Sequence, residues 1–178
     1  MKKLLAIMLA ALMVLSFAAC GGTTPENEGS DVVASVEGTP EELIEKIYAA
    51  FETLPEFPVA TMNLADMDAE SFPYFTGLAD NSKVKESAFS EAMMGSQAYS
   101  MVVVRLNDAA DSEAVATEML NGIDTRKWIC VEADDLVVAA YGDVVMLYMI
   151  DSQYGISSDS AVAAFEAVCG GEATVYTR

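Results

Sequence analysis

Three acidic side chains at alternating positions are the first residues in this sequence whose spacing suggests chemistry. Asp66, Asp68 and Glu70 follow one another at every second position, and hard carboxylate oxygens are the ligands that Ca²⁺ prefers. The segment lacks the turn glycine and the closing glutamate of a calcium-binding loop. We therefore expect a solvated loop without a bound metal, with these three residues as weak candidates for a metal site.

A second group of carboxylates, Glu132, Asp134 and Asp135, has residue types that suit general acid–base catalysis, as in glycosidases. Such groups arise without a catalytic role in a chain this acidic, which has 28 Asp and Glu against nine Lys and Arg. The chain contains no His, which excludes Ser-His triads, Cys-His pairs, histidine general bases and histidine zinc sites. We expect no catalytic residue and no cofactor.

Cys20 ends a segment with the layout of a secretory signal. Met1-Lys2-Lys3 is cationic, and residues 4–19 are uncharged and apolar. The apolar run is shorter than the about 20 residues of a transmembrane helix. Phe17-Ala18-Ala19-Cys20 resembles a bacterial lipobox, in which lipid is attached to the cysteine thiol and the signal is cut before it, although Phe17 stands where Leu is usual. Ordinary signal cleavage after Ala18 is the alternative.

Cys130 and Cys169 remain as a candidate disulfide pair if Cys20 carries a lipid. An exported protein meets an oxidising environment, which favours a bridge. The alternative is two free cysteines packed as small apolar side chains. The sequence alone leaves both arrangements open.

The segment after Cys20 has the composition of a flexible tether, because residues 21–38 are rich in Gly, Ser, Thr and Glu and poor in aromatic residues. We divide the chain into a signal peptide (1–19), a lipidated cysteine with its tether (20–38) and one domain (39–178). Lipid on Cys20 places that domain at the outer face of the cytoplasmic membrane, since two acyl chains anchor a protein stably.

Without its signal the chain has seven basic and 28 acidic residues, a formal charge of −21. Nucleic acid and anionic lipid surfaces bind clustered Lys and Arg, so this charge argues against both as partners. The expected partners are the membrane, through the lipid on Cys20, and another protein of the cell envelope.

The N-terminal half of the domain begins with one clear helix. Residues 40–54 have Thr39 as N-cap, a proline at the first position and an apolar stripe, and Pro55 follows them. Residues 59–95 show no sustained period, so we expect irregular packing and short strands there. Residues 97–106 contain three consecutive valines, which favour a strand that is covered on both faces or inserted centrally in a sheet.

The C-terminal half predicts two helices and a hairpin. Asp108 caps a helix over 108–122, in which Val115, Met119 and Ile123 share one face. Strands at about 136–141 and 144–151 flank Gly142-Asp143, a pair suited to a tight turn. A last short helix begins after a serine cap near residue 157. These elements predict an α+β fold, with a mainly antiparallel sheet and helices packed on one face.

Several large apolar side chains lie outside these patterns. Met93-Met94, together with Phe72, Tyr74 and Phe75, suits a pliable groove for a peptide or ligand. Core packing is the expected role of all five residues. Trp128 follows Arg126 and Lys127 and is likewise expected to fill the core rather than form an exposed patch.

The order of these elements is itself characteristic. It consists of the helix at 40–54, a tyrosine-containing middle at 72–80, the strand at 97–106, the capped helix at 108–122, the pair Arg126-Lys127 and a hairpin that ends in Asp151. With the lipobox, this order resembles an uncharacterised family of lipoproteins from Gram-positive, clostridia-like bacteria that carry a domain of unknown function. The resemblance covers about residues 39–155. It implies an envelope location and an α+β fold, and no active site.

The sequence therefore favours a membrane-anchored extracytoplasmic lipoprotein that acts as a non-enzymatic binding or interaction module of the cell envelope. Two alternatives remain: an envelope hydrolase that depends on carboxylates, and a lipoprotein that captures a small ligand.

Overall fold

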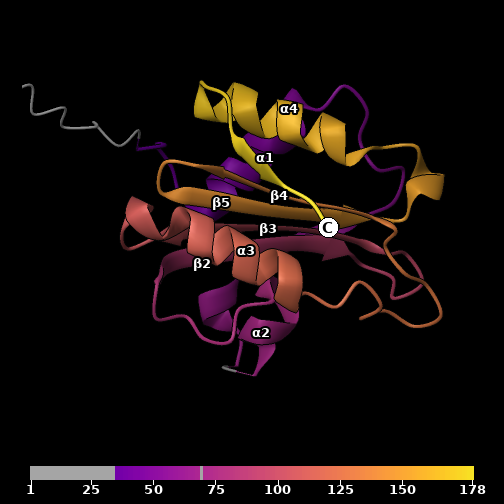
Figure 1. The fold of residues 1–178 in the computed structure, drawn as a ribbon. Coiled ribbons are helices and arrows are strands. Elements are labelled where there is room, and N and C mark those ends of the chain that lie inside the picture. The colour runs from indigo at the N-terminus through magenta and orange to yellow at the C-terminus, as the bar shows by residue number, and fades with distance from the viewer. Residues whose placement is uncertain (1–34, 69) are drawn as a thin grey trace, which may run out of the picture. The chain divides into compact units, whose positions relative to one another are not determined.

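A six-stranded antiparallel sheet forms the centre of the computed structural model, which describes residues 35–68 and 70–178 (Figure 1). The signal peptide, Cys20 and the tether up to residue 34 lie outside the described residues. Neighbouring strands follow the order β1-β2-β3-β5-β4-β6. The strands are β1 (Val59–Asn63), β2 (Val84–Ala92), β3 (Tyr99–Leu106), β4 (Asp135–Tyr141), β5 (Val144–Ile150) and β6 (Thr174–Tyr176). The helices are α1 (Pro40–Ala50), α2 (Ser71–Thr76), α3 (Ser112–Gly122) and α4 (Ser158–Cys169).

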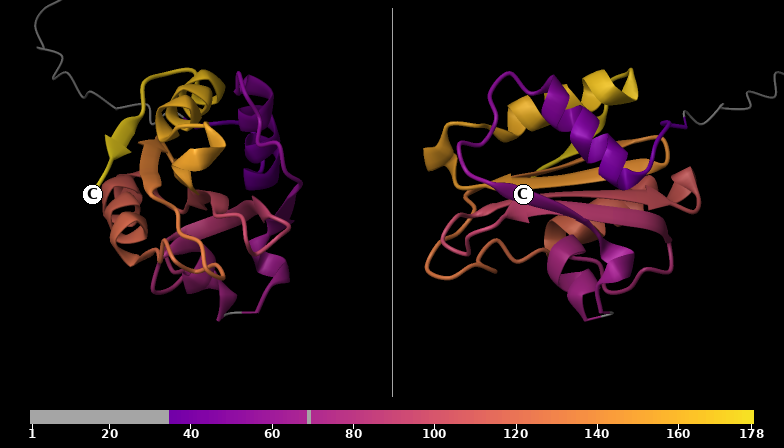
Figure 2. Two further views of the ribbon diagram at one scale, coloured as in Figure 1. Left: turned by 90° about the vertical axis from the view of Figure 1, so that its right-hand side faces the viewer. Right: turned by 180° about the vertical axis from the view of Figure 1, so that it is seen from behind.

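The α+β class and the antiparallel sheet are confirmed, but the expectation of helices on one face is wrong. Helices α1 and α4 cover one face of the sheet, and α2 and α3 cover the other (Figures 1 and 2). The reason lies in β3, where all eight residues are buried. Successive side chains of a strand point to opposite faces, so Val102 and Val104 enter one core while Met101 and Val103 enter the other. Two apolar faces need two layers of helix.

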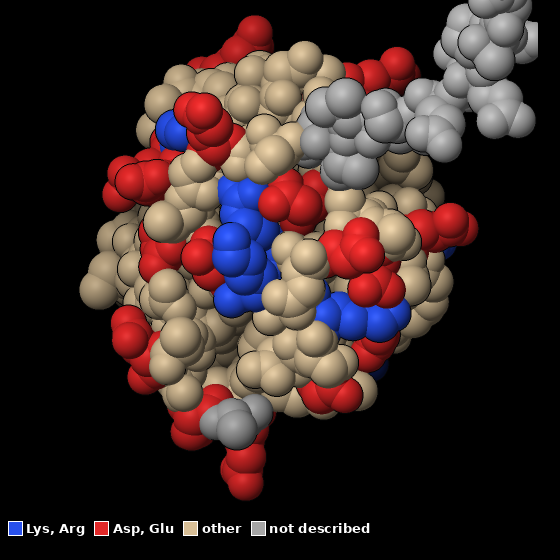
Figure 3. All heavy atoms as spheres, turned by 90° about the vertical axis from the view of Figure 1, so that its left-hand side faces the viewer, with Lys and Arg blue, Asp and Glu red and all other residues tan. Residues whose placement is uncertain are grey.

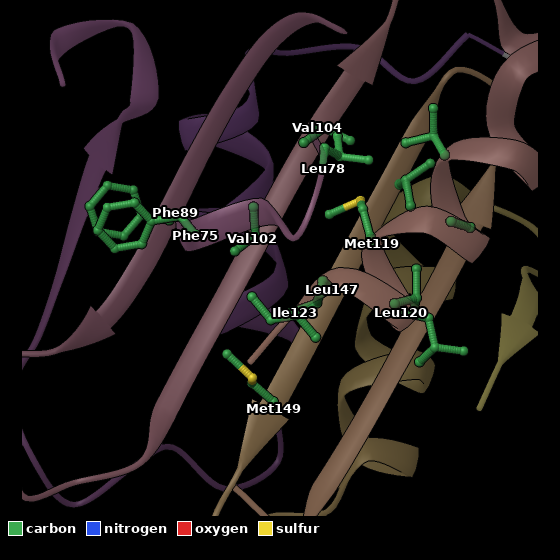
Figure 4. Close-up of a cluster of buried hydrophobic side chains, with 14 of the residues drawn as sticks. Phe75, Leu78, Phe89, Val102, Val104, Met119, Leu120, Ile123, Leu147 and Met149 are labelled. Atoms are coloured by element: carbon green, nitrogen blue, oxygen red, sulfur yellow. The ribbon is translucent and has the colours of Figure 1, made fainter. Parts of the chain in front are cut away.

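The core between the sheet and α3 is built by the predicted apolar stripe. Val115, Met119 and Ile123 are all buried there against β3 and β5, as Figure 4 shows for the last two. At one side of this core the rings of Phe75 and Phe89 stack with centroids 3.8 Å apart. Strand β2 thereby joins α2 to the sheet.

The predicted N-terminal helix begins where expected and ends early. The capping box is present, since the Glu42 backbone N–H donates to Thr39 Oγ1 and the Thr39 N–H donates to the Glu42 carboxylate. The helix ends at Ala50 rather than residue 54, because Phe51 is extended and packs on the ring of Tyr148. Leu54 is consequently exposed instead of continuing the stripe.

The predicted hairpin and the last two helices are confirmed. Strands β4 and β5 pair in register up to Tyr141 and Val144, and Gly142 has a positive φ of 57° in the turn between them. Asp108 caps a short 3₁₀ turn that leads into α3. Among the described residues 59–95, β2 is longer than expected: it has nine residues and pairs with β3 along its length. The short edge strand β6 is not foreseen by the sequence pattern.

Two glycines let α2 and α3 meet closely. Gly77 ends α2 with a φ of 74°, in the left-handed region that glycine favours. A side chain on Gly122, the last residue of α3, would place its Cβ 1.9 Å from the Gly77 carbonyl oxygen. The backbones of the two helix ends are therefore in direct contact.

Candidate interaction surface

The described chain enters the domain at one end of the sheet, where Arg105 of β3 holds it. Arg105 Nη2 donates to the carbonyl oxygens of Val36 and Gly38 at 2.7 and 2.6 Å. Its Nη1 donates to the Asp143 carboxylate in the β4–β5 turn at 2.6 Å. Arg105 is buried, so these partners satisfy a charge that would otherwise be costly in the core.

Lys46 of α1 completes this arrangement, which we call the entry clamp (Arg105, Lys46 and the carbonyls of Val36–Gly38). Lys46 Nζ donates to the carbonyl oxygen of Glu37 at 3.1 Å, so three successive carbonyls are bound by cationic side chains. Figure 3 shows Lys and Arg side chains gathered at this end, with acidic side chains around them. Val36, which lies before the predicted domain start at residue 39, is buried and packs in the core of the domain.

A buried ion pair lies toward the other end of β3. The Lys127 ammonium contacts the carboxylate of Glu91 on β2, and the side chain of Lys127 is 1% exposed. Three aromatic rings surround the ammonium at centroid distances of 4.9, 5.0 and 5.3 Å: Tyr74, Phe75 and Trp128. Cations are attracted to ring faces at such distances. Burial lowers the pKa of Lys127 below its ordinary value, although Glu91 opposes that shift.

This ion pair fixes the surface above it rather than offering a reactive amine. The Tyr74 hydroxyl donates to the Lys127 carbonyl at 3.2 Å, which ties α2 to the loop before β4. A depression of about 410 Å³ is lined by other residues of that loop: Arg126, Trp128, Cys130, Val131 and Glu132. Lys127 itself is enclosed by its rings and Glu91.

Four exposed apolar side chains lie over this end of the molecule. They come from α2, the β2–β3 turn and the loop before β4, and their exposed fractions are 46% for Tyr74, 67% for Met93, 51% for Met94 and 77% for Ile129. The turn and the loop are joined, because the Ile129 N–H donates to the Gly95 carbonyl at 3.1 Å. We call these four residues the distal surface. In the left view of Figure 2 this end of the domain faces the reader.

The expectation of core packing is therefore right for some apolar residues and wrong for others. Phe75 and Trp128 are buried, as expected. Tyr74, Met93 and Met94 are exposed instead. Both methionines lie in the β2–β3 turn, which carries them beyond the edge of the core. Arg105, Glu91 and Lys127 are the residues that sequence reasoning missed. The signal for Arg105 was present, since a charge within the apolar run of β3 implies a buried partner.

The weak metal candidates do not converge. Asp68 accepts hydrogen bonds from both the N–H and the hydroxyl of Ser71, which lowers the pKa of Asp68. Asp66 lies in a 3₁₀ turn, and Glu70 precedes α2. Across residues 35–68 and 70–178, no three acidic or Cys side chains are grouped so as to hold a metal ion.

The second group of carboxylates is also divided among separate partners. Glu132 pairs with Arg126 at 2.7 Å. Asp134 accepts from the N–H and hydroxyl of Ser152, and Asp135 accepts from the N–H of Ser158. These carboxylates cap backbone or pair with a cation, which is structural work for an acid.

The candidate disulfide is not formed, and both cysteines are free thiols. Cys130 is exposed in the loop whose neighbours Trp128 and Val131 pack on the α3 side of the sheet, whereas Cys169 packs with the α4 core. The sheet separates the two thiols. Burial raises the pKa of Cys169 to about 12, with Asp143 and Glu166 adding to the shift.

No family model matches the chain, and no curated protein or solved structure is significantly similar to it. The resemblance to an uncharacterised lipoprotein family stays a prediction. Within the part of the chain that the structure describes, no helix is long and apolar enough to cross a membrane.

Proposed function

We propose that this protein is a membrane-anchored extracytoplasmic lipoprotein that acts as a non-enzymatic interaction module of the cell envelope. The observation that carries the proposal is the placement of the entry clamp and the distal surface at opposite ends of β3. Arg105 binds the incoming chain, whereas Ser100, five positions earlier on β3, lies within 3.5 Å of the Lys127 ammonium. Five strand residues span roughly 17 Å.

This polarity suits a protein that is anchored through its N-terminus. A chain that comes from a lipid on Cys20 would join the domain at the Arg105 end, so the distal surface lies at the end of the domain opposite to its point of attachment. The apolar side chains exposed there are then available to other components of the envelope. Exposed apolar side chains that cluster mark interaction sites more often than those scattered singly.

The alternative of a carboxylate-dependent hydrolase gains less support. A catalytic pair needs two acids that face one pocket with separated pKa values. Glu132, Asp134 and Asp135 instead bind three different partners. Asp134 even has a lowered pKa, caused by its hydrogen bonds from Ser152, which is opposite to what a general acid needs.

The first experiment follows the anchor in a Gram-positive host. We expect mass spectrometry to find a diacylglyceryl group on an N-terminal Cys20, and Cys20→Ala to move the protein out of the membrane fraction. Cys130→Ala is the matched control and leaves the protein membrane-bound. An unmodified N-terminus at Ala19 would remove the lipoprotein from the proposal.

The second experiment tests whether the domain lies on the outer side of the membrane. A membrane-impermeant maleimide added to intact cells is expected to label Cys130, which is exposed near the distal surface.

A third experiment tests for catalysis. Hydrolysis of purified cell-wall glycan by the protein, lost on Glu132→Gln or Asp134→Asn, would favour the hydrolase instead.

A further inference from the structure

The distal surface combines exposed apolar side chains with a local excess of negative charge. Arg126 and Lys127 are the basic residues beside it, and each is already paired with a carboxylate, Glu132 and Glu91. Asp124 adds a further acid, since its charge and that of Glu91 raise the pKa of Tyr74 beyond the effect of burial. A partner therefore meets apolar side chains in a negative field.

The distal surface is also held in place before any partner arrives. The contact of Lys127 with Glu91, the Tyr74 hydrogen bond to the Lys127 carbonyl and the Ile129 hydrogen bond to Gly95 link its three segments. Binding then costs little ordering of the backbone, which favours affinity. Met93 and Met94 are the adaptable part, because an unbranched thioether side chain fits apolar partners of varied shape.

The net negative charge of the protein restricts which kind of partner can bind the distal surface. A second copy, likewise without its signal, would bring another formal charge of −21 against the first, and like charges oppose association. An anionic lipid surface is disfavoured for the same reason. A polypeptide segment with apolar side chains and neighbouring Lys or Arg would cover the exposed apolar side chains, and its cations would be attracted by the negative charge.

We infer that the distal surface docks a basic amphipathic segment of a partner protein. This inference rests on the proposed function as an interaction module and names the chemistry of its partner. The apolar side chains of the segment lie on Met93, Met94 and Ile129, and its cations lie toward Asp124 and Glu132. Both an amphipathic helix and an extended strand present apolar side chains on one face, with room for cations beside them.

The test uses Trp128 as its reporter, because it is the single Trp of the chain and lies beneath the distal surface. The purified protein, in phosphatidylcholine nanodiscs if its N-terminus carries lipid, is titrated with three peptides of about 18 residues, five helical turns. The first contains Leu and Lys, the second Leu and Glu, and the third has Ser in place of Leu with the same Lys.

We expect saturable binding, seen as a change in Trp128 emission, for the Leu and Lys peptide alone. Ile129→Ser combined with Met93→Ser is expected to weaken it at least tenfold. Val175→Ser, which removes an exposed β-branched residue on β6, is the matched control and leaves binding unchanged. Circular dichroism checks that each variant is folded.

Three results would overturn the inference. Equal binding of the Ser and Lys peptide would mean that charge alone attracts it. Unchanged binding by the double variant would place the site elsewhere. Sedimentation of the free protein as a dimer that the double variant abolishes would mean that a second copy covers the distal surface. None of these results depends on lipidation of Cys20, so they are separate from failure of the anchor.

Discussion

The ammonium of Lys127 and the carboxylate of Glu91 form a contact that is largely shielded from solvent, between a loop and a strand that are 36 positions apart in the sequence. A pair of this kind costs desolvation on both sides, and its loss leaves one buried charge alone. Its value is therefore in fixing where the loop before β4 lies. Removal of one partner should therefore destabilise the protein more than replacement of both partners by apolar residues.

Lys127→Met is expected to lower the free energy of unfolding by about 3 kcal/mol, because Glu91 is then buried without its cation. Lys127→Met combined with Glu91→Leu is expected to recover most of that loss, since no buried charge remains. Urea denaturation followed by circular dichroism measures both. If the double variant is no more stable than the single one, the cost comes from packing against the aromatic rings rather than from the charge.

Arg105→Met is expected to release the entry clamp and to lower the free energy of unfolding by about 3 kcal/mol. The substitution removes a buried cation and leaves the Asp143 carboxylate without its partner. Hydrogen exchange of the backbone N–H groups near Val36–Gly38 should rise. Lys83→Met is the control: its pair with Asp111 is exposed, and surface pairs contribute about 0–1 kcal/mol. Equal effects of the two variants would contradict the clamp.

Gly122→Ala is expected to destabilise the protein by about 3 kcal/mol, because its Cβ would collide with the carbonyl oxygen of Gly77 and force α2 from α3. Gly95→Ala is the matched change, since a Cβ there has no atom within 4 Å among the described residues. Thermal unfolding of both variants compares them. A tolerated Gly122→Ala would mean that the two helix ends can separate at little cost.

Alkaline pH should unfold the protein through its buried tyrosines. Burial raises the pKa of Tyr99 and of Tyr148, whereas phenols of the unfolded chain ionise near pH 10. Above about pH 10 the unfolded state therefore binds fewer protons than the folded state, and stability falls as the pH rises. Urea denaturation midpoints, measured from about pH 8 to about pH 11 so that the series brackets the ordinary phenol pKa, follow this loss of stability.

Two phenylalanine variants separate the roles of these tyrosines. The Tyr148 hydroxyl is buried and has no hydrogen-bond partner among the described residues, so Tyr148→Phe should cost nothing at pH 7 and reduce the alkaline fall. Tyr99→Phe should cost about 1 kcal/mol at pH 7, because Tyr48 loses a bond of 2.9 Å. A loss of stability at pH 7 in Tyr148→Phe would imply a water partner.

The two described thiols should differ in reactivity. Cys130 is exposed, whereas the thiol of Cys169 is half-buried with a pKa raised to about 12. Because the thiolate is the nucleophile, a maleimide at pH 7 should modify Cys130 much faster than Cys169. Peptide mapping by mass spectrometry reads each site, and Cys130→Ser removes the fast phase. Equal rates would indicate that α4 opens readily.

Local patterns were sufficient for much of the fold. The capping box at Thr39, the valines of β3 and the Gly142 turn each determine structure through neighbours in sequence, and each is found as predicted. The number of covered faces was also implicit in β3, because its consecutive valines place apolar side chains on both faces of the strand. The expectation of helices on one face overlooked that consequence.

The surface features needed contacts between distant segments. Whether Met93 is buried or exposed depends on where the β2–β3 turn lies relative to the core, which its own residues do not determine. The partners of Lys127 likewise come from α2, β2 and β3. Hydrophobicity alone predicted the core for Tyr74, Met93 and Met94, and tertiary structure placed all three outside it.

The position of Arg105 also decides how the domain responds to mechanical force. Tension on the N-terminal segment reaches Val36–Gly38 first, and the guanidinium passes it to β3 rather than to the first turn of α1. Strand β3 is hydrogen-bonded along both sides, to β2 and to β5. A pull on the N-terminal segment is thus shared among several strands, and α1 is shielded from unwinding at its start.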